Sequence, residues 1–338
     1  MSLRQDAVVF SKPAHCALQE IKLAELKPKQ VLIRTHISGV STGTDRWVIS
    51  GRFEWGSFSF PLIPGYQRVG TVEAIGSDVS TLSVGQSVFA TNSVDFLNAT
   101  AGWGAHTSIG ISEEHEVFDA TGINPERASF GVVAQVGFNA SSRVLGGRQT
   151  RVLVIGDGII GASAALSSRA LDREVMVIGR HDSRLSKLAN LGIATANART
   201  LDISTLKDFA PSAVIDTVQN KEAFDMYRQT LPATWAQEAL GARSQGTGQI
   251  IYSGHTPDGE SNWGDMAELQ KQELTVHFVS GWTRERMQST LDLMRGDAMP
   301  IEALADRHEA TNAGVQTLFG LVEQGKYPGL AAYINWGN

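Results

Sequence analysis

The sequence contains almost no cysteine: Cys16 is the only one among 338 residues. No intrachain disulfide can form, and a zinc site made of several cysteines is excluded. The chain also lacks a run of about 18 apolar residues, which a membrane-spanning helix requires. Its first residues, MSLRQDAVVFSKPAH, hold no long apolar segment of the kind that a secretory signal needs. We therefore expect a cytoplasmic protein that does not enter the membrane.

A surplus of basic residues is missing as well. The 29 Lys and Arg residues are outnumbered by 35 Asp and Glu residues, which gives a formal net charge of -6. A protein with this balance has no general attraction to nucleic acid or to anionic membranes. We therefore expect neither nucleic acid nor a membrane as a partner, and the partner that we expect from the motifs below is a small-molecule substrate.

The residues that are present fit an α/β protein of roughly two domains, at ~150 residues per domain. Residues 5–110 have the pattern of short strands separated by glycine and proline, which predicts a β-rich, barrel-like unit. A helix is predicted over 125–145, with a proline at its start. From residue 151 onward, apolar strands alternate with helical segments, and this alternation predicts a doubly wound parallel sheet.

The most specific motif is a glycine-rich turn within RVLVIGDGIIGASAAL. Gly156, Gly158 and Gly161 follow an apolar strand and open a helix, as a dinucleotide-binding turn requires. The first glycine permits a tight turn, the second lets the backbone approach a pyrophosphate, and the third lets helix and strand pack closely. Ile159 and Ile160 begin the helix, whose free N–H groups attract phosphate. The alternative is a glycine-rich turn that binds no ligand.

The second strand of this unit indicates which dinucleotide is bound. An NAD site usually has an acidic residue about 20 residues after the glycines, where it binds the ribose 2′-OH. Here Gly179 stands in that place and Arg180 follows, so a 2′-phosphate has room and a guanidinium to hold it. Arg184 and Lys187 add positive charge. We predict NADP(H) as the cofactor; the alternative is NAD, with Arg180 in solvent and Asp182 on the ribose.

Taken together, these segments resemble the medium-chain dehydrogenase/reductase family from end to end of the chain. The likeness is carried by VGTVEAIGSDVSTLSVGQSVFA, GWGAH and QKQELTVHFVSG. Within the family, the motifs nearest to the bacteriochlorophyllide a 3-hydroxyethyl dehydrogenase group are SGVSTGTDR, PLIPGYQRVG and the closing INW. The resemblance implies a GroES-like catalytic β-barrel domain at 1–146 and 282–338, a Rossmann NADP-binding domain at 147–281, and an active site in the cleft. It also implies a homodimer.

The same resemblance implies further contacts with the cofactor. Thr217 and Val218, at the end of VIDTV, would border the path from adenosine to nicotinamide. Gly254, His255 and Thr256 would lie by the nicotinamide amide, where backbone groups usually make the contact.

Zinc-using relatives take their first metal ligand from the Cys of GxCxTD or GxCxSD. Here the string is GVSTGTD, so Thr42 stands at that position if Ser41 is a one-residue insertion. Tyr66 replaces the His ligand, Gln67 replaces the neighbouring Glu, and SFGVVAQVGFN offers no third donor. Catalytic zinc needs about three good protein ligands. We therefore expect a relative that works without zinc.

Without zinc, hydrogen-bond donors must stabilise the oxygen of the reacting carbonyl. Tyr66 and Thr44 are the candidates, because a phenol whose pKa is lowered by its surroundings can donate a proton and Thr44 falls on the relay hydroxyl of relatives. Thr42 and Asp45 would orient them. Two alternatives stay open: Tyr66 is the donor or a core aromatic residue, and His106 reaches the cleft or is an exposed strand residue.

A substrate pocket is suggested by four aromatic residues from loops of the N-terminal part, Trp47, Phe53, Trp55 and Trp103. Such side chains line apolar pockets for bulky or cyclic molecules, but they are equally compatible with an ordinary core. Gln135 lies in the helix expected beside the nicotinamide. It either binds substrate or cofactor or is a buried structural amide.

Three functions follow from these residues. The first is a zinc-independent, NADP(H)-dependent oxidoreductase that transfers hydride between the nicotinamide and a carbonyl/alcohol substrate. The second is an NADPH-dependent conjugate reductase of enones or quinones, and the third is a non-catalytic NADPH-binding protein. Residues 220–248 are long for a helix and turn of this family, and we expect them to form a surface excursion or a subunit contact.

Overall fold

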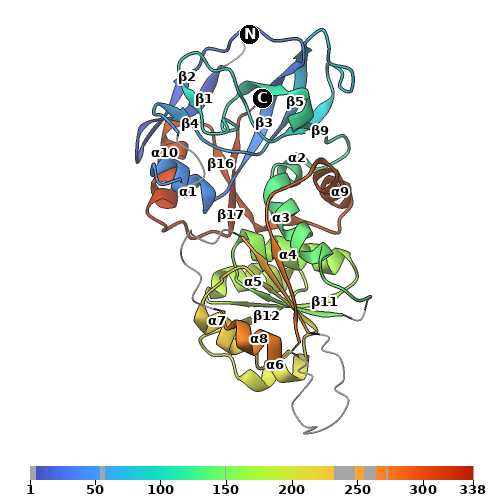
Figure 1. Cartoon of the computed structure of the whole chain (residues 1–338). Helices are drawn as coiled ribbons and strands as arrows, with labels where there is room; N and C mark the ends of the chain where they lie inside the picture. The colour runs from blue at the N-terminus through green and yellow to red at the C-terminus, as the bar shows by residue number, and fades with distance from the viewer. Residues whose placement is uncertain are drawn as a thin grey trace. The chain divides into compact units, whose positions relative to one another are not determined.

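The computed structural model describes residues 5–53, 58–148, 150–231, 248–254, 264–271 and 273–337. The chain divides into two compact units (Figure 1): Met1–Val132, Met294–Gly296 and Leu304–Asn338 in the first, and Val133–Leu293 and Asp297–Ala303 in the second. The division predicted at 146/147 and 281/282 stays a prediction. Trp55, His255, Thr256 and residues 232–247 of the long segment lie outside the described residues.

The first unit contains two β-sheets. The larger sheet has the order β16-β17-β3-β5-β6-β9, and β8 also pairs with β3. Its strands are β3 (Gln30–Val40), β5 (Arg68–Ile75), β6 (Ser87–Ala90), β8 (Ile109–Glu113), β9 (Val117–Asp119), β16 (Ala305–Glu309) and β17 (Ala331–Asn335). The smaller sheet has the order β2-β1-β4-β7, from β1 (Asp6–Lys12), β2 (His15–Glu20), β4 (Leu62–Ile63) and β7 (Thr100–Ala101).

The side chains of β3 show why this segment forms a central strand. Val31, Ile33, Thr35 and Ile37 are buried, and the alternate residues Leu32, Arg34 and His36 are more exposed, as a strand with a period of two requires. In Figure 1, the red strand β17 lies beside the blue β3, and Ile334 stands opposite Ser38 in an antiparallel register. A late segment of the chain therefore completes the sheet that the early strands begin.

Helices of the first unit pack against these sheets. They are α1 (Thr44–Ile49), α2 (Pro125–Ala128), the 3₁₀ turn η1 (Glu114–Glu116) and α10 (Asn312–Glu323). Phe10 of β1 packs edge to face on Phe319 of α10, with ring centroids 5.4 Å apart. Aromatic pairs of this geometry add to the stability that burial gives. The core thus joins residues that are far apart in sequence.

Arg68, the first residue of β5, is fully buried inside the first unit. Its guanidinium donates hydrogen bonds to three carbonyl oxygens and two hydroxyl oxygens, those of Ile33, Asn92, Gly110, Thr35 and Ser112. Burial lowers the pKa of Arg68 to about 9. Because these bonds anchor the start of β5, they also fix the backbone that carries Tyr66 two residues earlier.

The second unit contains one sheet of six strands in the order β12-β11-β10-β13-β14-β15. The strands are β10 (Arg151–Ile155), β11 (Glu174–Gly179), β12 (Ala194–Asn197), β13 (Ala213–Asp216), β14 (Gln249–Ser253) and β15 (Thr275–Val279). Every neighbouring pair is parallel. The predicted combination of a β-rich unit with a doubly wound parallel sheet is confirmed.

The remaining helices are α3 (Gly131–Ser142), α4 (Ile159–Ala170), α5 (Asp182–Asn190), α6 (Ile203–Phe209), α7 (Lys221–Tyr227), α8 (Met266–Lys271), α9 (Arg284–Arg295) and the 3₁₀ turn η2 (Ile301–Leu304). α4 and α5 cover one face of the parallel sheet, and α6, α7 and α8 cover the other (Figure 1). The strand order reverses at β10 and β13. In sheets of this type, ligands bind at the carboxyl ends of the strands beside such a reversal.

Two sequence predictions about local structure are wrong. The single helix predicted over 125–145 is two helices, α2 and α3, because α2 closes in a tight turn in which Phe130 N–H donates to the carbonyl of Arg127 at 3.1 Å. The strand predicted over 104–110 begins only at Ile109, since the preceding residues form a loop bonded to Pro64 and Gly65. Among the described residues, no helix is both long and apolar enough to span a bilayer.

Candidate functional site

The glycine-rich turn connects β10 to α4 in the second unit. Gly156 has φ +116°, and a Cβ there would lie 2.2 Å from Oγ1 of Thr217, so both the conformation and the space require glycine. A Cβ on Gly161 would lie 2.0 Å from the carbonyl oxygen of Gly156. A Cβ on Gly158 would meet nothing within 4 Å. The turn is therefore closed on the protein side and open at Gly158, where α4 begins with Ile159 and Ile160.

A cavity of about 270 Å³ adjoins this turn at the carboxyl ends of the strands. Its walls come from the ends of β10 and β11, the segment after β12, and α7 with the loop that precedes it. The lining includes Gly156, Asp157, Gly179, Arg180, His181, Ala198, Val218, Asn220 and Met226. Its position and its mixture of apolar walls with a charged rim suit the adenosine half of a dinucleotide. An open glycine turn beside such a cavity fits the cofactor that the sequence predicts.

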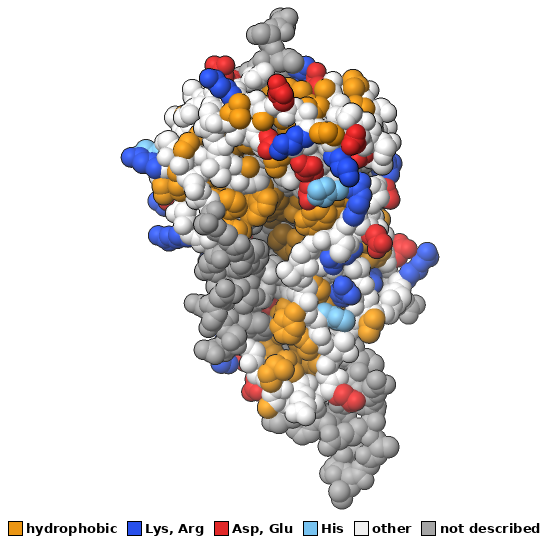
Figure 2. All heavy atoms as spheres, turned by 45° about the horizontal axis from the view of Figure 1, so that its top comes forward, with side chains coloured by type: hydrophobic (Ala, Val, Ile, Leu, Met, Phe, Trp, Pro, Cys, Tyr) orange, Lys and Arg blue, Asp and Glu red, His pale blue; other side chains and the backbone are white. Residues whose placement is uncertain are grey.

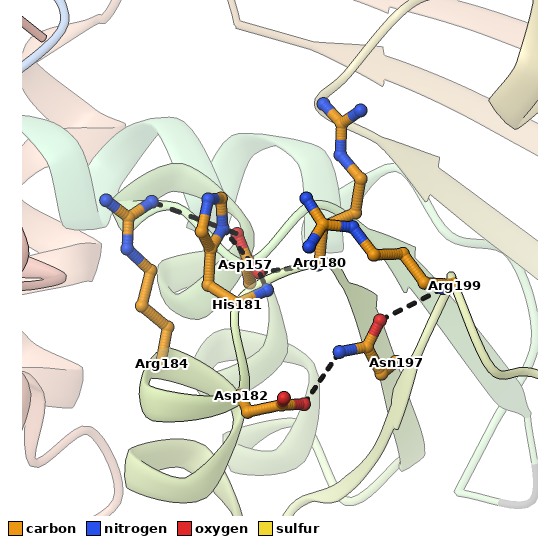
Figure 3. Close-up of polar contacts among 7 residues, drawn as sticks. All are labelled: Asp157, Arg180, His181, Asp182, Arg184, Asn197 and Arg199. Atoms are coloured by element: carbon orange, nitrogen blue, oxygen red, sulfur yellow. Dashed lines mark hydrogen bonds and ion pairs between the residues drawn. The ribbon is translucent and has the colours of Figure 1, made fainter.

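Asp157, between the first two glycines of the motif, occupies the end of β11. Its Oδ2 accepts hydrogen bonds from the backbone N–H groups of Arg180 and His181, each at 2.7 Å. Nδ1 of His181 lies 3.0 Å from both carboxylate oxygens (Figure 3). Burial acts to raise the pKa of Asp157, but the bonds from the His181 ring and from the two backbone N–H groups outweigh it and hold that pKa below its ordinary value.

The position of Asp157 also explains Gly179. A Cβ at residue 179 would lie 2.4 Å from Cβ and Oδ2 of Asp157, so no larger side chain fits there. Sequence reasoning found Gly179 but missed Asp157, because the middle residue of the glycine motif is normally unrestricted. The sequence does contain a hint of this contact. Asp157 is an acidic residue inside the glycine motif, and Gly179 stands where an acidic residue would end the second strand.

Positive charge gathers around this carboxylate. Arg180 is exposed at the cavity rim, and Figure 3 also draws Arg199, which is exposed in the segment after β12. A guanidinium nitrogen of Arg184 lies 3.9 Å from Oδ1 of Asp157. Asp182, the alternative ribose ligand, instead accepts a hydrogen bond from Asn197 at 2.6 Å and does not line the cavity. Lys187 lies two turns into α5.

The loop after β13 forms another wall of the cavity. Oδ1 of the buried Asp216 accepts hydrogen bonds from the N–H groups of Val218 and Gln219, each at 2.9 Å, and Oδ2 accepts one from Tyr227 at 3.0 Å. Burial raises the pKa of Asp216, although these three donors act in the opposite direction. Asp216 thereby fixes the loop that carries Thr217 and Val218, and Gly254, with φ +101°, follows the adjacent strand β14.

A second set of predicted residues meets in the first unit. The hydroxyl of Tyr66 donates to Oγ1 of Thr44 across a long 3.5 Å, and both side chains are partly buried. Burial, followed by the negative charge of Asp45, raises the pKa of Tyr66 to about 12, despite hydrogen bonds with Ser41 and Thr44. The phenol is therefore a neutral donor at physiological pH. The polar neighbours in the protein therefore do not lower the pKa of Tyr66, and a lowering by a bound cationic nicotinamide stays a prediction.

Asp45 is buried in α1 and belongs to a chain of polar contacts. Its Oδ2 accepts a hydrogen bond from the N–H of Ser41 at 2.9 Å and lies 3.4 Å from Nε2 of His106. Nδ1 of His106 lies 2.9 Å from Oγ of Ser38, which also accepts a bond from the indole of Trp336. His106 is fully buried, so the exposed-residue alternative is wrong. Ser38 and Trp336 could not be linked from sequence, since 298 residues separate them.

Trp103 packs on Tyr66 and joins it to a cluster of aromatic rings. The Trp103 ring packs at 5.5 Å and 81° to Tyr66, at 5.1 Å to Phe53 and at 5.4 Å to Phe58. Trp103 has φ +64°, which is rare for a bulky side chain. Its backbone is held by hydrogen bonds from Ser93 to its carbonyl and from its two glycine neighbours to Ile63. Trp47 is partly buried in α1.

Thr42 and Gln135 complete the predicted set. Thr42 is partly buried just before α1, in the same segment as Thr44. Gln135 in α3 is fully buried, and within the described part of the chain neither atom of its amide has a hydrogen-bond partner. A buried amide in this state costs free energy unless a ligand or water satisfies it.

The residues at the zinc position of relatives do not fit a zinc ion. Among the described residues, no group of three or more His, Cys, Asp and Glu side chains could hold a metal ion. Burial raises the pKa of Cys16 to about 11, so its thiol is a poor source of the thiolate that metals bind. Thr42 and Tyr66 carry neutral hydroxyl groups, which are weak zinc ligands.

The face of the molecule drawn in Figure 2 carries charges of both signs. Over the upper part of the face drawn in Figure 2, Lys and Arg side chains are interspersed with Asp and Glu side chains. This distribution fits the net charge of -6. The absence of a nucleic-acid partner stays a prediction.

Comparisons with known proteins give the same assignment as the motifs. A family model described as the alcohol dehydrogenase GroES-like domain matches residues 27–135. The 2-desacetyl-2-hydroxyethyl bacteriochlorophyllide A dehydrogenase of Cereibacter sphaeroides is 28% identical over 183 residues, which are 52% of this chain and 56% of that protein. The chain thus matches little more than half the length of this relative.

Two further comparisons cover nearly the whole chain. A quinone oxidoreductase of Pongo abelii is 24% identical over 89% of this chain and 91% of its own length. The structure of 2R,3R-butanediol dehydrogenase from Bacillus subtilis superposes with a TM-score of 0.82 over 98% of this chain and 99% of that one, at 14% identity, which establishes the shared fold. These matches and the motifs all indicate the medium-chain dehydrogenase/reductase family.

Proposed function

We propose that this chain is a zinc-independent, NADP(H)-dependent oxidoreductase that interconverts a carbonyl and an alcohol. The observation that carries the proposal is the open glycine turn of Gly156–Gly161 beside a cavity whose rim holds Arg180 and His181. Similarity to dehydrogenases and quinone oxidoreductases supports the reaction class.

Each part of the second unit has a role toward the cofactor. A bound nicotinamide supplies the hydride chemistry. The open N–H groups at Gly158 and the start of α4 would hold the pyrophosphate. Arg180 and Arg184 would hold the 2′-phosphate, since guanidinium groups match phosphate geometry. Thr217, Val218 and Gly254 would border the dinucleotide along the ends of β13 and β14.

Tyr66 would donate a hydrogen bond to the substrate oxygen. Because the pKa of Tyr66 is raised to about 12, its proton stays on the phenol until charge develops on that oxygen. Thr44, 3.5 Å away, is placed to pass a proton onward. Trp103 packs on the phenol, and Phe53 and Phe58 pack on Trp103, so apolar surface extends from the donor, which supports a bulky or cyclic substrate.

Conjugate reduction of an enone or quinone is the second candidate. The match with a quinone oxidoreductase over 89% of this chain favours it, and a phenol donor serves an enolate oxygen as well as an alkoxide. Product analysis separates the two reactions: an allylic alcohol indicates carbonyl reduction, and a saturated ketone indicates conjugate reduction.

The proposal is tested with chelator-treated protein and a panel of cyclic carbonyls and enones. We expect NADPH to bind at least about tenfold more tightly than NADH, because hydrogen bonds to a charged phosphate contribute about 1.5–3 kcal/mol. We expect turnover without metal, and a loss of about a hundredfold or more in kcat for Tyr66→Phe with unchanged NADPH binding. Tyr333→Phe is the matched control, because its hydroxyl bonds to Glu126. Binding without any turnover would instead support a non-catalytic NADPH-binding protein.

A further inference from the structure

The adenosine cavity contains a carboxylate in a position that decides which nucleotide it accepts. We propose that Asp157 and His181 act as a pair, in which His181 covers the Asp157 carboxylate and so allows a 2′-phosphorylated adenine nucleotide to bind. The inference rests on the proposed dinucleotide site. It adds two residues that determine specificity to the guanidinium contacts described above.

The first step of the argument is the place of the carboxylate. The Asp157 side chain fills the space beside Gly179, where a Cβ would lie 2.4 Å from its Oδ2. Its Oδ2 accepts hydrogen bonds from the backbone N–H groups of Arg180 and His181, each at 2.7 Å, so the carboxylate lies at the end of β11. A carboxylate at the end of this strand normally accepts the ribose hydroxyls and excludes a phosphate. Asp157, from the glycine turn, therefore places a carboxylate where NAD-binding relatives have an acidic residue at the end of the second strand.

The second step is the cover over this carboxylate. An ionised carboxylate only accepts hydrogen bonds, so Nδ1 of His181, 3.0 Å from both oxygens, carries a proton. The Asp157 side chain is only 8% exposed, whereas the His181 side chain is 52% exposed. The other ring nitrogen of His181, Nε2, belongs to this exposed side chain and can face an approaching anion. A ligand at the rim meets the imidazole before it meets the carboxylate.

The third step is the charge around the pair. Among the residues drawn in Figure 3, the three guanidinium groups of Arg180, Arg184 and Arg199 outnumber the carboxylates of Asp157 and Asp182. Arg184 lies 3.9 Å from Asp157 and compensates part of its charge. Glu222 of α7 also lines the cavity and is exposed to solvent. When the His181 ring covers the Asp157 carboxylate, the positive charge at the cavity rim favours binding of a dianionic phosphate. Without that ring, the carboxylate would place a negative charge beside the phosphate and repel it.

Fragments of the cofactor test the pair without any reaction. Adenosine 2′,5′-bisphosphate and adenosine 5′-monophosphate differ only in the 2′-phosphate, and calorimetric titration measures their dissociation constants with the full chain. The variants are His181→Ala, Asp157→Asn, the double variant, and Asp182→Asn as a control. The control removes the same charge from a neighbouring side chain that does not line the cavity. Asn at 157 keeps an oxygen that can accept the two backbone N–H groups.

We expect the wild type to bind the bisphosphate at least about tenfold more tightly than the monophosphate. His181→Ala should weaken bisphosphate binding about tenfold or more and leave monophosphate binding within about twofold. In the double variant, most of the lost bisphosphate affinity should return, because the uncovered charge is gone. Asp157→Asn alone and Asp182→Asn should not weaken it.

The recovery in the double variant is the decisive result. If the double variant binds the bisphosphate as weakly as His181→Ala, His181 acts only through direct contact and the pairing is wrong. If His181→Ala leaves the ratio of the two affinities unchanged, the inference is also overturned. Binding of the monophosphate would in that case still support the nucleotide site itself. Absence of binding by both fragments to the wild type would overturn the dinucleotide site itself and, with it, the inference. Thermal unfolding of each variant shows whether it is folded.

Discussion

Nε2 of His106 lies 3.4 Å from Oδ2 of Asp45, and both side chains are buried although 61 residues separate them in the chain. Asp45 comes from α1, and His106 comes from the loop that holds Trp103 against Tyr66. A buried contact of this kind fixes the loop relative to the helix. It therefore sets the geometry around the phenol without contacting substrate itself.

Removal of His106 should destabilise the protein strongly. His106→Leu leaves the Asp45 carboxylate buried without its imidazole, and loss of one partner of a buried pair costs about 3–5 kcal/mol. Urea denaturation measures the change in the free energy of unfolding. Lys27→Met is the matched control, because Lys27 and Asp95 form a pair that is 60% and 25% exposed and should contribute less than about 1 kcal/mol. Equal effects of the two changes would contradict the role of His106.

The substitution Trp103→Leu should weaken binding of aromatic substrates more than binding of small aliphatic ones. The indole contacts Tyr66, Phe53 and Phe58, so its loss removes apolar surface beside the donor. Aromatic contacts of this kind contribute about 0.5–1.5 kcal/mol, so we expect KM for an aromatic aldehyde to rise by about two- to tenfold. KM for a short aliphatic aldehyde should not change, and Trp103→Phe should preserve most of the difference. A parallel loss for both aldehydes would indicate a purely structural role.

The ionised carboxylate of Asp157 should stabilise the folded protein at neutral pH and lose this effect in acid. Because its pKa is lower in the folded chain than in the unfolded one, its contribution is fully present above the ordinary aspartate value and is lost as pH falls through the folded value. We therefore expect the acid limb of the curve of melting temperature against pH to be flatter in Asp157→Asn. Differential scanning fluorimetry between about pH 2.5 and 7 measures this. An unchanged acid limb would show that the carboxylate is not stabilised by its donors.

We propose that the chain forms a homodimer through β15. This strand is at the edge of the parallel sheet as described, and Phe278 on it is 73% exposed, as is Met266 of α8. An exposed apolar edge strand readily pairs with a second copy. Phe278→Glu should shift the mass measured by light scattering from dimer to monomer. Leu97→Glu changes a side chain of 68% exposure in the first unit and should leave the mass unchanged. A wild-type monomer would end the proposal.

The fold was largely predictable because its signals are local. The alternation of strands and helices after residue 151, and glycines 156, 158 and 161, each depend on neighbours in the chain. The strand predicted over 104–110 failed because the backbone bonds of this segment go to Pro64 and Gly65, which no local pattern reveals. Within the candidate site, Tyr66 and Thr44, which the sequence suggested as a pair, lie within 3.5 Å of each other in the structure.

Other features of the site depend on contacts between distant segments. Asp157 meets Arg180 and His181 across 23 and 24 residues, so its role could not follow from the glycine motif alone. The raised pKa of Tyr66 is likewise a result of burial, which only the folded chain shows. The residue types that the sequence suggested for the chemistry stay predictions, and the contacts between distant residues that surround them could not be predicted from sequence.

The pairing of β17 with β3 has a consequence for how the chain is made. Residues 37–40 of β3 are synthesised early, but their partners in β17 follow the whole second unit. On a ribosome that adds about 5–20 residues per second, the partner strand β17 is synthesised roughly 15 to 60 seconds after β3. During translation the edge of β3 is open, and the second unit has time to fold first. A polypeptide interrupted before Ala331 would keep that edge open permanently and would be prone to intermolecular strand pairing.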